Sequence, residues 1–215
     1  MKVITRADFT PFDWEAVMIS RRRRLPHVTL PGAIYFVTFR LGDAEPLEVA
    51  QQWKLARTAW LEQNPPPWSE ETEKEYHRRF TMRMEKYLDA GYGACDLRTE
   101  NLREEVLASL YHDDGRHYDL GDVVIMPNHV HVLLKPLSPT PVSKLMGPAK
   151  GASARRINQM TGRSGVLWMD ESFDHIVRSL ESLKKFQRYV ADNPTKAGLS
   201  KGAYFYEQRW EIGDE

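Results

Sequence analysis

The chain has 215 residues, of which 41% are hydrophobic and 11% aromatic, so it can bury a core and is not disordered throughout. Its one cysteine, Cys95, excludes an internal disulfide and the cysteine clusters of zinc ribbons and iron–sulfur centres. No apolar run approaches the roughly 20 residues of a membrane span, and residues 1–12 lack the apolar segment of a secretory signal. We therefore expect a cytoplasmic protein with no membrane partner and a single domain over residues 1–215.

The net charge is zero, from 30 basic and 30 acidic residues, which by itself argues against a nucleic-acid partner. The charges are, however, unevenly distributed along the chain. Residues 1–40 hold 7 basic and 3 acidic side chains, residues 41–139 hold 11 and 18, and residues 140–190 hold 9 and 4. Two basic segments of net charge +4 and +5 therefore flank an acidic segment of net charge −7.

The N-terminal third combines a basic arm, one strand and a helical region. Residues 1–30 form the arm and contain the run Arg21, Arg22, Arg23 and Arg24, which is either a solvated segment or a phosphate-binding one. The β-branched and aromatic residues 33–39 predict a buried strand. Residues 46–90 predict largely exposed helices, interrupted at 64–67 by Asn-Pro-Pro-Pro. Trp53, Leu55 and Trp60 give the first helix some apolar face, whereas the helix over 69–88 has few core positions. We expect this region to be a helical insertion in a compact domain.

The rest of the chain alternates helices with short apolar runs. We predict a helix over 99–112, a strand hairpin over 118–126 and 129–134, a helix over 142–160, a short strand near 166–168 and a helix over 180–192. The last helix should end at Asn193-Pro194, because proline disfavours helical conformation in the residue before it. The order of the first six elements predicts an α+β fold: a ferredoxin-like βαββαβ antiparallel sheet with an extra C-terminal helix.

His129 and His131 are separated by one residue within the second strand of the hairpin. Side chains alternate between the faces of a strand, so both imidazoles point to the same side. Paired imidazoles favour divalent metals, although two histidines on a strand face are also common without a metal. Two ligands do not complete a metal site, so a third must come from elsewhere in the fold.

The segment around this pair resembles the HUH motif of single-strand DNA nucleases and transposases. More closely, it resembles the REP-associated tyrosine transposases, a single-tyrosine family related to the IS200-like transposases. The resemblance continues in family order over residues 21–200, most of the chain. Its pieces are Leu25–His27 with Gly32–Phe39, Met126–His131, Trp168 with Phe173–Arg178, and Tyr189–Leu199.

The resemblance implies an enzyme that cuts one DNA strand through a 5′-phosphotyrosine intermediate and can rejoin it to another strand. Tyr189 matches the nucleophile, on a helix expected over 180–193. His129 and His131 match the ligands of Mg²⁺ or Mn²⁺, and Asn193 matches a third, polar ligand, although an asparagine there could equally be a helix C-cap. Stored ester energy makes a nucleotide cofactor unnecessary, and the chain has no Gly-rich nucleotide loop.

The implied partner is single-stranded DNA beside a short palindromic hairpin, the REP-like element. Basic residues are candidate phosphate contacts, with salt-dependent affinity. Besides the four arginines of the N-terminal arm, they are Lys144, Lys150, Arg155, Arg156, Lys184, Lys185 and Arg188.

Two other functions remain open from the sequence. One is a domesticated hairpin-DNA-binding regulatory protein without transposition. The other is a metal-dependent nucleotide phosphodiesterase, which would need neither Tyr189 nor the basic segments. We expect a monomer, with a dimer that exchanges tyrosine helices as the alternative.

Overall fold

The computed structural model describes residues 1–9, 18–20, 27–65, 68–170 and 172–213. Arg21 to Arg24 lie outside the described residues, so their predicted role is not addressed by the structure. The strands are β1 Lys2–Ile4, β2 Met18–Ser20, β3 His27–Thr29, β4 Ile34–Arg40, β5 Tyr118–Ile125, β6 His129–Pro136, β7 Phe173–Val177, β8 Phe205–Glu207 and β9 Trp210–Ile212. The helices are α1 Leu47–Gln63, α2 Glu70–Tyr76, α3 Met82–Asp89, α4 Glu100–Tyr111, α5 Val142–Thr161 and α6 Leu180–Lys196, with short turns η1 Arg6–Asp8, η2 His77–Thr81 and η3 Asp96–Arg98.

The main sheet has five strands in the order β7-β4-β6-β5-β8, and every neighbouring pair is antiparallel. Strands β4, β5, β6 and β7, with α4 and α5 as the connecting helices, form the predicted ferredoxin-like βαββαβ unit. The α+β prediction is therefore confirmed. Strand β8 extends the sheet beyond β5.

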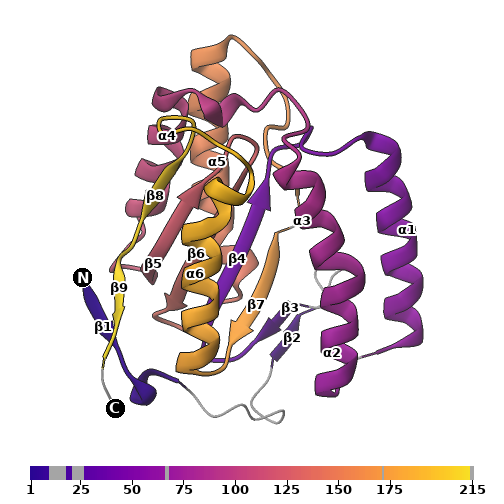
Figure 1. The fold of residues 1–215 in the computed structure, drawn as a ribbon, viewed down its shortest axis with the longest axis vertical. Helices are drawn as coiled ribbons and strands as arrows, with labels where there is room; N and C mark the ends of the chain where they lie inside the picture. Colours follow the sequence, from indigo (N-terminus) through magenta and orange to yellow (C-terminus); the bar gives the residue numbers. More distant parts are fainter. Residues whose placement is uncertain (10–17, 21–26, 66–67, 171, 214–215) are drawn as a thin grey trace.

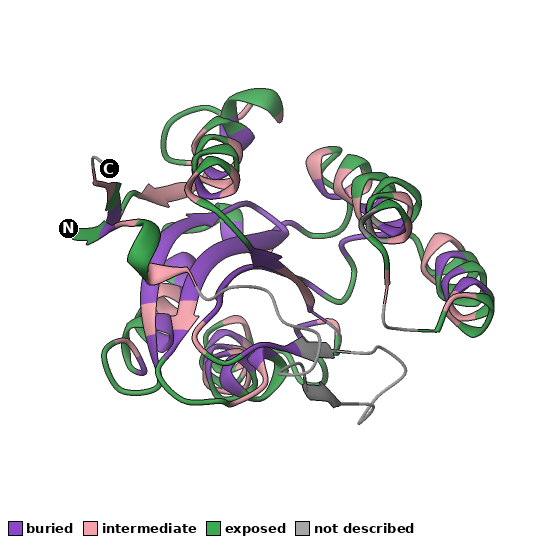
Figure 2. Ribbon diagram, turned by 90° about the horizontal axis from the view of Figure 1, so that it is seen from below, coloured by how far each residue is buried: buried purple, intermediate pink, exposed green. Residues whose placement is uncertain are grey.

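The sheet has a different helical layer on each face (Figures 1 and 2). Val130, Val132 and Leu134 of β6 are fully buried in the larger core, which also contains residues of α4 and α5. Leu133 of the same strand belongs to a second core, formed with Leu183 and other residues of α6. A strand buried on both faces reads as a continuous apolar run, as β6 does. Within the described residues, no helix is long and apolar enough to cross a membrane.

The helical insertion has a larger core than the sequence predicts. Its helices α1, α2 and α3 are present, but the expectation of few core positions is wrong, because aromatic side chains gather between them. Trp53 donates its indole N–H to the carbonyl oxygen of Phe80 at 3.2 Å and meets Phe173 of β7 at a ring-centroid distance of 5.4 Å. The insertion is thus joined to the edge of the main sheet. Its buried residues include Trp53, Arg57, Trp60, Tyr76, Phe80, Met84 and Leu88.

Two predicted boundaries are wrong. Residues 166–168 do not form a strand: Val166 is 86% exposed, and Trp168 makes one isolated bridge to Leu41 while its side chain packs on Phe39. The last strand of the unit is β7. Helix α6 does not end at residue 192 but continues to Lys196, with Pro194 inside it. Proline removes one helical hydrogen bond, but burial of Pro194 on the sheet outweighs that local cost.

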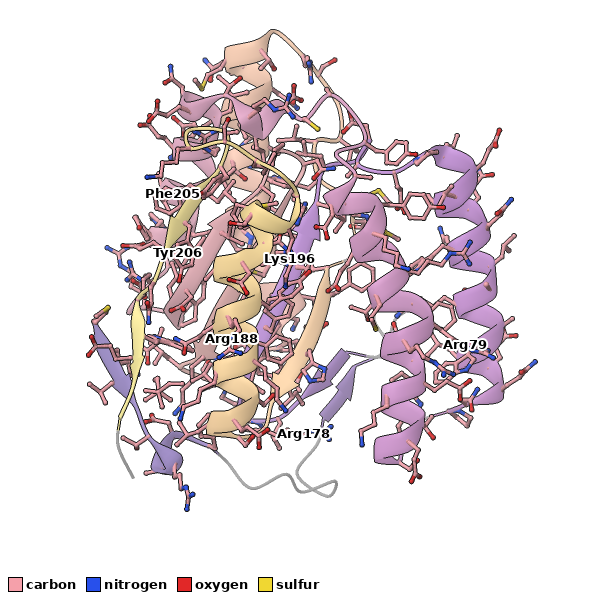
Figure 3. All side chains as sticks on the ribbon, viewed as in Figure 1. Arg79, Arg178, Arg188, Lys196, Phe205 and Tyr206 are labelled. Carbon is pink, nitrogen blue, oxygen red and sulfur yellow. The ribbon has the colours of Figure 1, made fainter. Side chains whose placement is uncertain are left out.

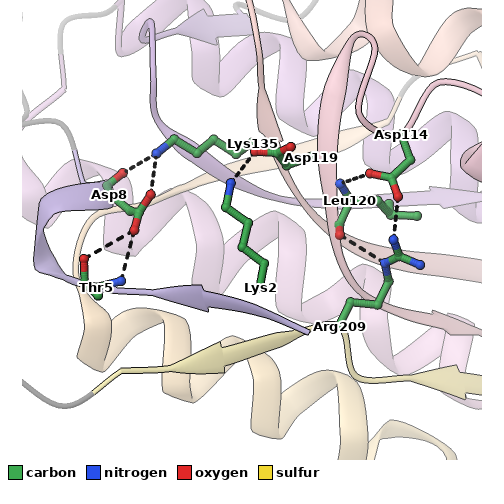
Figure 4. Close-up of polar contacts among 8 residues, drawn as sticks. All are labelled: Lys2, Thr5, Asp8, Asp114, Asp119, Leu120, Lys135 and Arg209. Atoms are coloured by element: carbon green, nitrogen blue, oxygen red, sulfur yellow. Dashed lines mark hydrogen bonds and ion pairs between the residues drawn. The ribbon is translucent and has the colours of Figure 1, made fainter.

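The two terminal segments lie together at one edge of the sheet (Figures 1 and 4). Strand β1 pairs in parallel with β9, and Lys135 of β6 donates to both the backbone oxygen and the carboxylate of Asp8. Trp210 lies over Gly121, where a Cβ atom would come within 2.7 Å of its ring. Glycine at this bulge of β5 therefore allows the tryptophan to approach the sheet.

Asp122, at the same bulge, connects the last segment to the sheet through a buried carboxylate. Its Oδ1 accepts backbone N–H groups of Arg209 and Trp210 at 3.0 and 3.1 Å. Burial raises the pKa of Asp122 above its ordinary 3.8, so the folded protein binds its proton more tightly than the unfolded chain does. The contribution of Asp122 to stability is therefore largest below pH 3.8 and falls as pH rises through the raised pKa.

We expect Asp122→Asn, which keeps the accepting oxygen without the charge, to gain stability relative to the wild type as pH rises above 3.8. Asp122→Ala, which loses the acceptor, should be less stable than Asp122→Asn by about 1–3 kcal/mol at every pH. Urea unfolding followed by circular dichroism from pH 3 to 7 measures both. A constant difference between Asp122→Asn and the wild type would contradict the titration argument.

Candidate active site

The two histidines lie near the middle of the main sheet, on the face covered by α6. Both histidines are on β6. On the neighbouring strand β4, Thr38 stands opposite His131 and Arg40 stands opposite His129. Both imidazoles are fully buried. As the alternation of side chains predicts, they face the same side, and their Nε2 atoms are 3.0 Å apart.

Each imidazole is fixed by a hydrogen bond at its other nitrogen. Asn128 donates its amide N–H to the carbonyl oxygen of Tyr92 at 3.0 Å, so its Oδ1 faces Nδ1 of His129 at 2.8 Å. His129 must therefore donate from Nδ1, which leaves its Nε2 without a proton in the neutral ring. The Thr38 hydroxyl lies 2.7 Å from Nδ1 of His131 and can either donate or accept.

Burial keeps both rings neutral. It lowers the pKa of His129 to about 3, with a further contribution from the positive charge of Arg40, and it lowers the pKa of His131 well below 6.5. When Thr38 donates, His131 can give its Nε2 proton to His129. When Thr38 accepts, both Nε2 lone pairs point at one position, and a cation there would remove their repulsion. The pair thus has the donor set and the supporting hydrogen bonds of a divalent metal site.

Asn193 lies inside α6 and is fully buried. Neither its amide nitrogen nor its oxygen has a hydrogen-bond partner among the described residues, although it is near enough to His129 and Tyr189 to affect their pKa values. It is not a helix C-cap, because the helix continues beyond it. In the described part of the chain, no group of three His, Cys, Asp or Glu could hold a metal ion. The unpartnered oxygen of Asn193 makes this residue the candidate for a third protein ligand.

Tyr189 lies one helical turn before Asn193 and contacts the histidine pair. Its ring centroid is 5.3 Å from that of His131 and 5.7 Å from that of Phe36. Its hydroxyl is buried and has no hydrogen-bond partner within geometric limits among the described residues. The fold therefore brings residue 189 next to residue 131, although 58 residues separate them in the sequence.

The insertion and the end of α6 contribute residues that the sequence did not single out. Burial, and then the negative charges of Glu85 and Asp89 on α3, raise the pKa of the Tyr189 phenol above its ordinary value of 10. Lys196 places its ammonium 5.2 Å from the centre of the Tyr189 ring. Helical spacing links Lys196 to Tyr189, but no sequence pattern links α3 to α6.

The predicted DNA-binding residues divide between two faces. Lys184, Lys185 and Arg188 are exposed on α6, and Figure 3 labels Arg188 and Lys196 on that helix. The others lie on α5, in the layer across the sheet from the histidines. There Lys150 donates to Met169, Asp170 and Ser172, and Arg156 pairs with Glu105, while Lys144 and Arg155 are exposed.

Comparison with known proteins identifies the segment that carries this site. Residues 98–193 match the family model described as IS200-like transposase, and this segment includes both histidines, Tyr189 and Asn193. This segment, a little under half of the chain, is therefore similar to the IS200-like transposases. None of the curated proteins matches the chain.

Two solved structures are similar to the chain. A REP-associated tyrosine transposase bound to a REP hairpin is 14% identical, with a TM-score of 0.44, over 85% of this chain and 77% of its own. A proposed transposase of Deinococcus radiodurans R1 is 16% identical, with a TM-score of 0.34, over 74% of this chain and 89% of its own. These low scores add nothing about function to the family match.

Asn193 offers a test that separates a ligand from a structural residue. Its amide has no partner, so Asn193→Leu, which keeps the branching at Cγ without polar atoms, should leave Tm unchanged or raise it. The same variant should weaken Mn²⁺ binding, because leucine has no donor atom. Differential scanning calorimetry and isothermal titration calorimetry measure the two effects. A loss of several degrees in Tm with unchanged Mn²⁺ affinity would assign Asn193 to the fold alone.

The hydrogen bonds at the Nδ1 atoms of the two histidines should affect the affinity of the pair for a cation. We expect Thr38→Val and Asn128→Leu each to weaken Mn²⁺ binding by about 10–100-fold, because the supported imidazoles lose their orientation. Thr38→Ser keeps the hydroxyl and should bind as the wild type does. Calorimetric titration with Mn²⁺ compares the three variants, and equal affinities for Thr38→Val and Thr38→Ser would contradict this role.

Proposed function

We propose that this chain is a metal-dependent single-strand DNA transposase that nicks and rejoins DNA through Tyr189. The IS200-like match gives the general function, a transposase acting on DNA. The observation that carries the finer proposal is the position of Tyr189 against His131, one helical turn from the unpartnered Asn193. Nucleophile and candidate cation ligands converge on one point of the sheet.

The proposed reaction is a transesterification. The phenol oxygen of Tyr189 loses its proton and attacks the scissile phosphorus, and the bond to the 3′ oxygen breaks. That oxygen takes up a proton to become a free 3′-OH, so the net proton transfer is from the phenol to the 3′ oxygen. The product is a 5′-phosphotyrosine ester, and attack by another 3′-OH reverses the step and joins strands. A divalent cation, Mg²⁺ or Mn²⁺, held by His129, His131 and Asn193 would polarise the phosphoryl oxygens.

The described arrangement is closed. Both histidines and Asn193 are fully buried, and Glu85 and Asp89 favour the protonated phenol. A DNA strand must therefore displace part of the cover formed by α3 and α6 before the phosphate reaches the site. Exclusion of water would then protect the phosphotyrosine from hydrolysis.

The substrate that we propose is single-stranded DNA beside a short palindromic hairpin. Support comes from the resemblance of Met126–His131 and Tyr189–Leu199 to the REP-associated transposases, and from the exposed cations of α6. One chain supplies the nucleophile and all three candidate ligands, which agrees with a monomer.

Labelled hairpin DNA with a single-stranded flank, incubated with Mg²⁺ or Mn²⁺, should form a covalent adduct visible on a denaturing gel. Tyr189→Phe should form none, because the nucleophilic oxygen is absent. His129→Ala and His131→Ala should lose cleavage, by a factor of about 10² or more, while retaining DNA binding.

Other outcomes of this experiment separate the alternative functions. Tight hairpin binding without an adduct under either metal would favour a domesticated binding protein. Hydrolysis of small nucleotides by the Tyr189→Phe variant at the wild-type rate would favour a phosphodiesterase. Full cleavage by either histidine variant would contradict the metal site.

A further inference from the structure

Helix α3 and the segments beside it form a groove with positively charged and aromatic side chains. Its volume of about 640 Å³ lies in the range of sites that bind small molecules or single nucleotides. The described residues that carry charge or rings into it are Arg78, Arg79, Arg83, Lys86, Tyr87 and Tyr92. The groove thus concentrates basic side chains within the segment 41–139, whose net charge is −7.

The cations of the groove are directed to solvent and only partly neutralised. Arg78, Arg79, Arg83 and Lys86 are exposed, and Arg79 pairs with Glu75 at 3.1 Å. Figure 3 labels Arg79 on the insertion. Among the described residues, neither Arg83 nor Lys86 has an ion pair, so both are available to an anion.

Two tyrosines supply flat surfaces in the same groove. The rings of Tyr87 and Tyr92 lie 5.8 Å apart between centroids, Tyr87 is half-buried, and Tyr92 is 44% exposed. Cations along a helix with adjoining aromatic rings are the combination that binds single-stranded nucleic acid, because phosphates meet the charges and unpaired bases stack on the rings. An anion site for phosphate alone would not need the rings.

The groove adjoins the candidate active site. Successive helical residues turn by 100°, so Lys86 lies about 60° around α3 from Asp89, which with Glu85 faces Tyr189, whereas Arg83 lies farther round the helix. The connection also runs through the backbone, since the carbonyl oxygen of Tyr92 holds Asn128. A strand in the groove would be about one helix diameter, roughly 10 Å, from the nucleophile.

We propose that this groove binds the single-stranded flank of the DNA substrate and guides it past α3 toward Tyr189. The proposal rests on the proposed function for the identity of the substrate. It assigns to the helical insertion a role that neither the sequence nor the family match to residues 98–193 assigns. Recognition is by charge and stacking, so it should not depend strongly on base sequence.

The test measures binding without catalysis, in the Tyr189→Phe background. Fluorescence anisotropy with labelled oligo(dT) at several salt concentrations should show that Lys86→Glu weakens binding on the order of tenfold. The slope of log affinity against log salt should fall by about 0.7, as expected for one lost phosphate contact on a single strand. Oligo(dT) carrying 5-iodouracil should crosslink, under ultraviolet light, to Tyr87 or Tyr92.

Lys54→Glu is the matched control. It makes the same charge change on an exposed lysine of the insertion, on α1 and outside the groove. Its affinity and salt slope should equal those of the background protein. Equal effects of Lys86→Glu and Lys54→Glu, or crosslinks confined to other segments, would overturn the proposal. Displacement of oligo(dT) by polyglutamate at equal charge would assign the groove to acidic peptides instead.

These readouts do not depend on the cleavage chemistry. Absence of the covalent adduct with wild-type protein would overturn the proposed function, whereas the anisotropy and crosslinks report on the groove. Circular dichroism of both glutamate variants checks that the fold is intact, which is expected because both lysines are exposed.

Discussion

Two imidazole nitrogens 3.0 Å apart in a fully buried position set the main constraint on this structure. When both rings are neutral, their two Nε2 atoms can share one proton. The hydrogen bonds at the Nδ1 atoms then determine which Nε2 carries that proton. Asn128 fixes one ring, and the Thr38 hydroxyl can serve either state of the other. The register of β4 against β6 places Thr38 opposite His131. A shift in this register would therefore remove the hydrogen bond at Nδ1 of His131.

The helical insertion contacts both the main sheet and Tyr189, although its place in the sequence does not indicate this. It interrupts the βαββαβ unit between β4 and α4, yet Trp53 connects it to β7, and α3 carries Glu85 and Asp89 to Tyr189. One face of α3 is buried through Met84 and Leu88. A single helix thus joins the core, the environment of the nucleophile and the basic groove.

The architecture and the histidine pair could be predicted from the sequence because they depend on local patterns. Long apolar runs indicate buried strands, and alternation places His129 and His131 on one face. The end of α6 could not be predicted, because tertiary burial of Pro194 outweighs its local preference. The proximity of Glu85 to Tyr189 could not be predicted either, because no periodicity relates side chains on separate helices. The assignment of Tyr189 and Asn193 came from family resemblance and not from the pattern of the helix.

Tyr92 belongs to both regions: its side chain lines the groove, and its carbonyl oxygen holds the asparagine that orients His129. A ligand that shifts this turn would move Asn128 and, with it, the imidazole of His129. Under the proposed function, thermodynamic linkage would be reciprocal: cation binding at the histidines would change the affinity of the groove by the same factor. The length of the proposed DNA flank would then affect cation affinity at the histidines as well as binding in the groove.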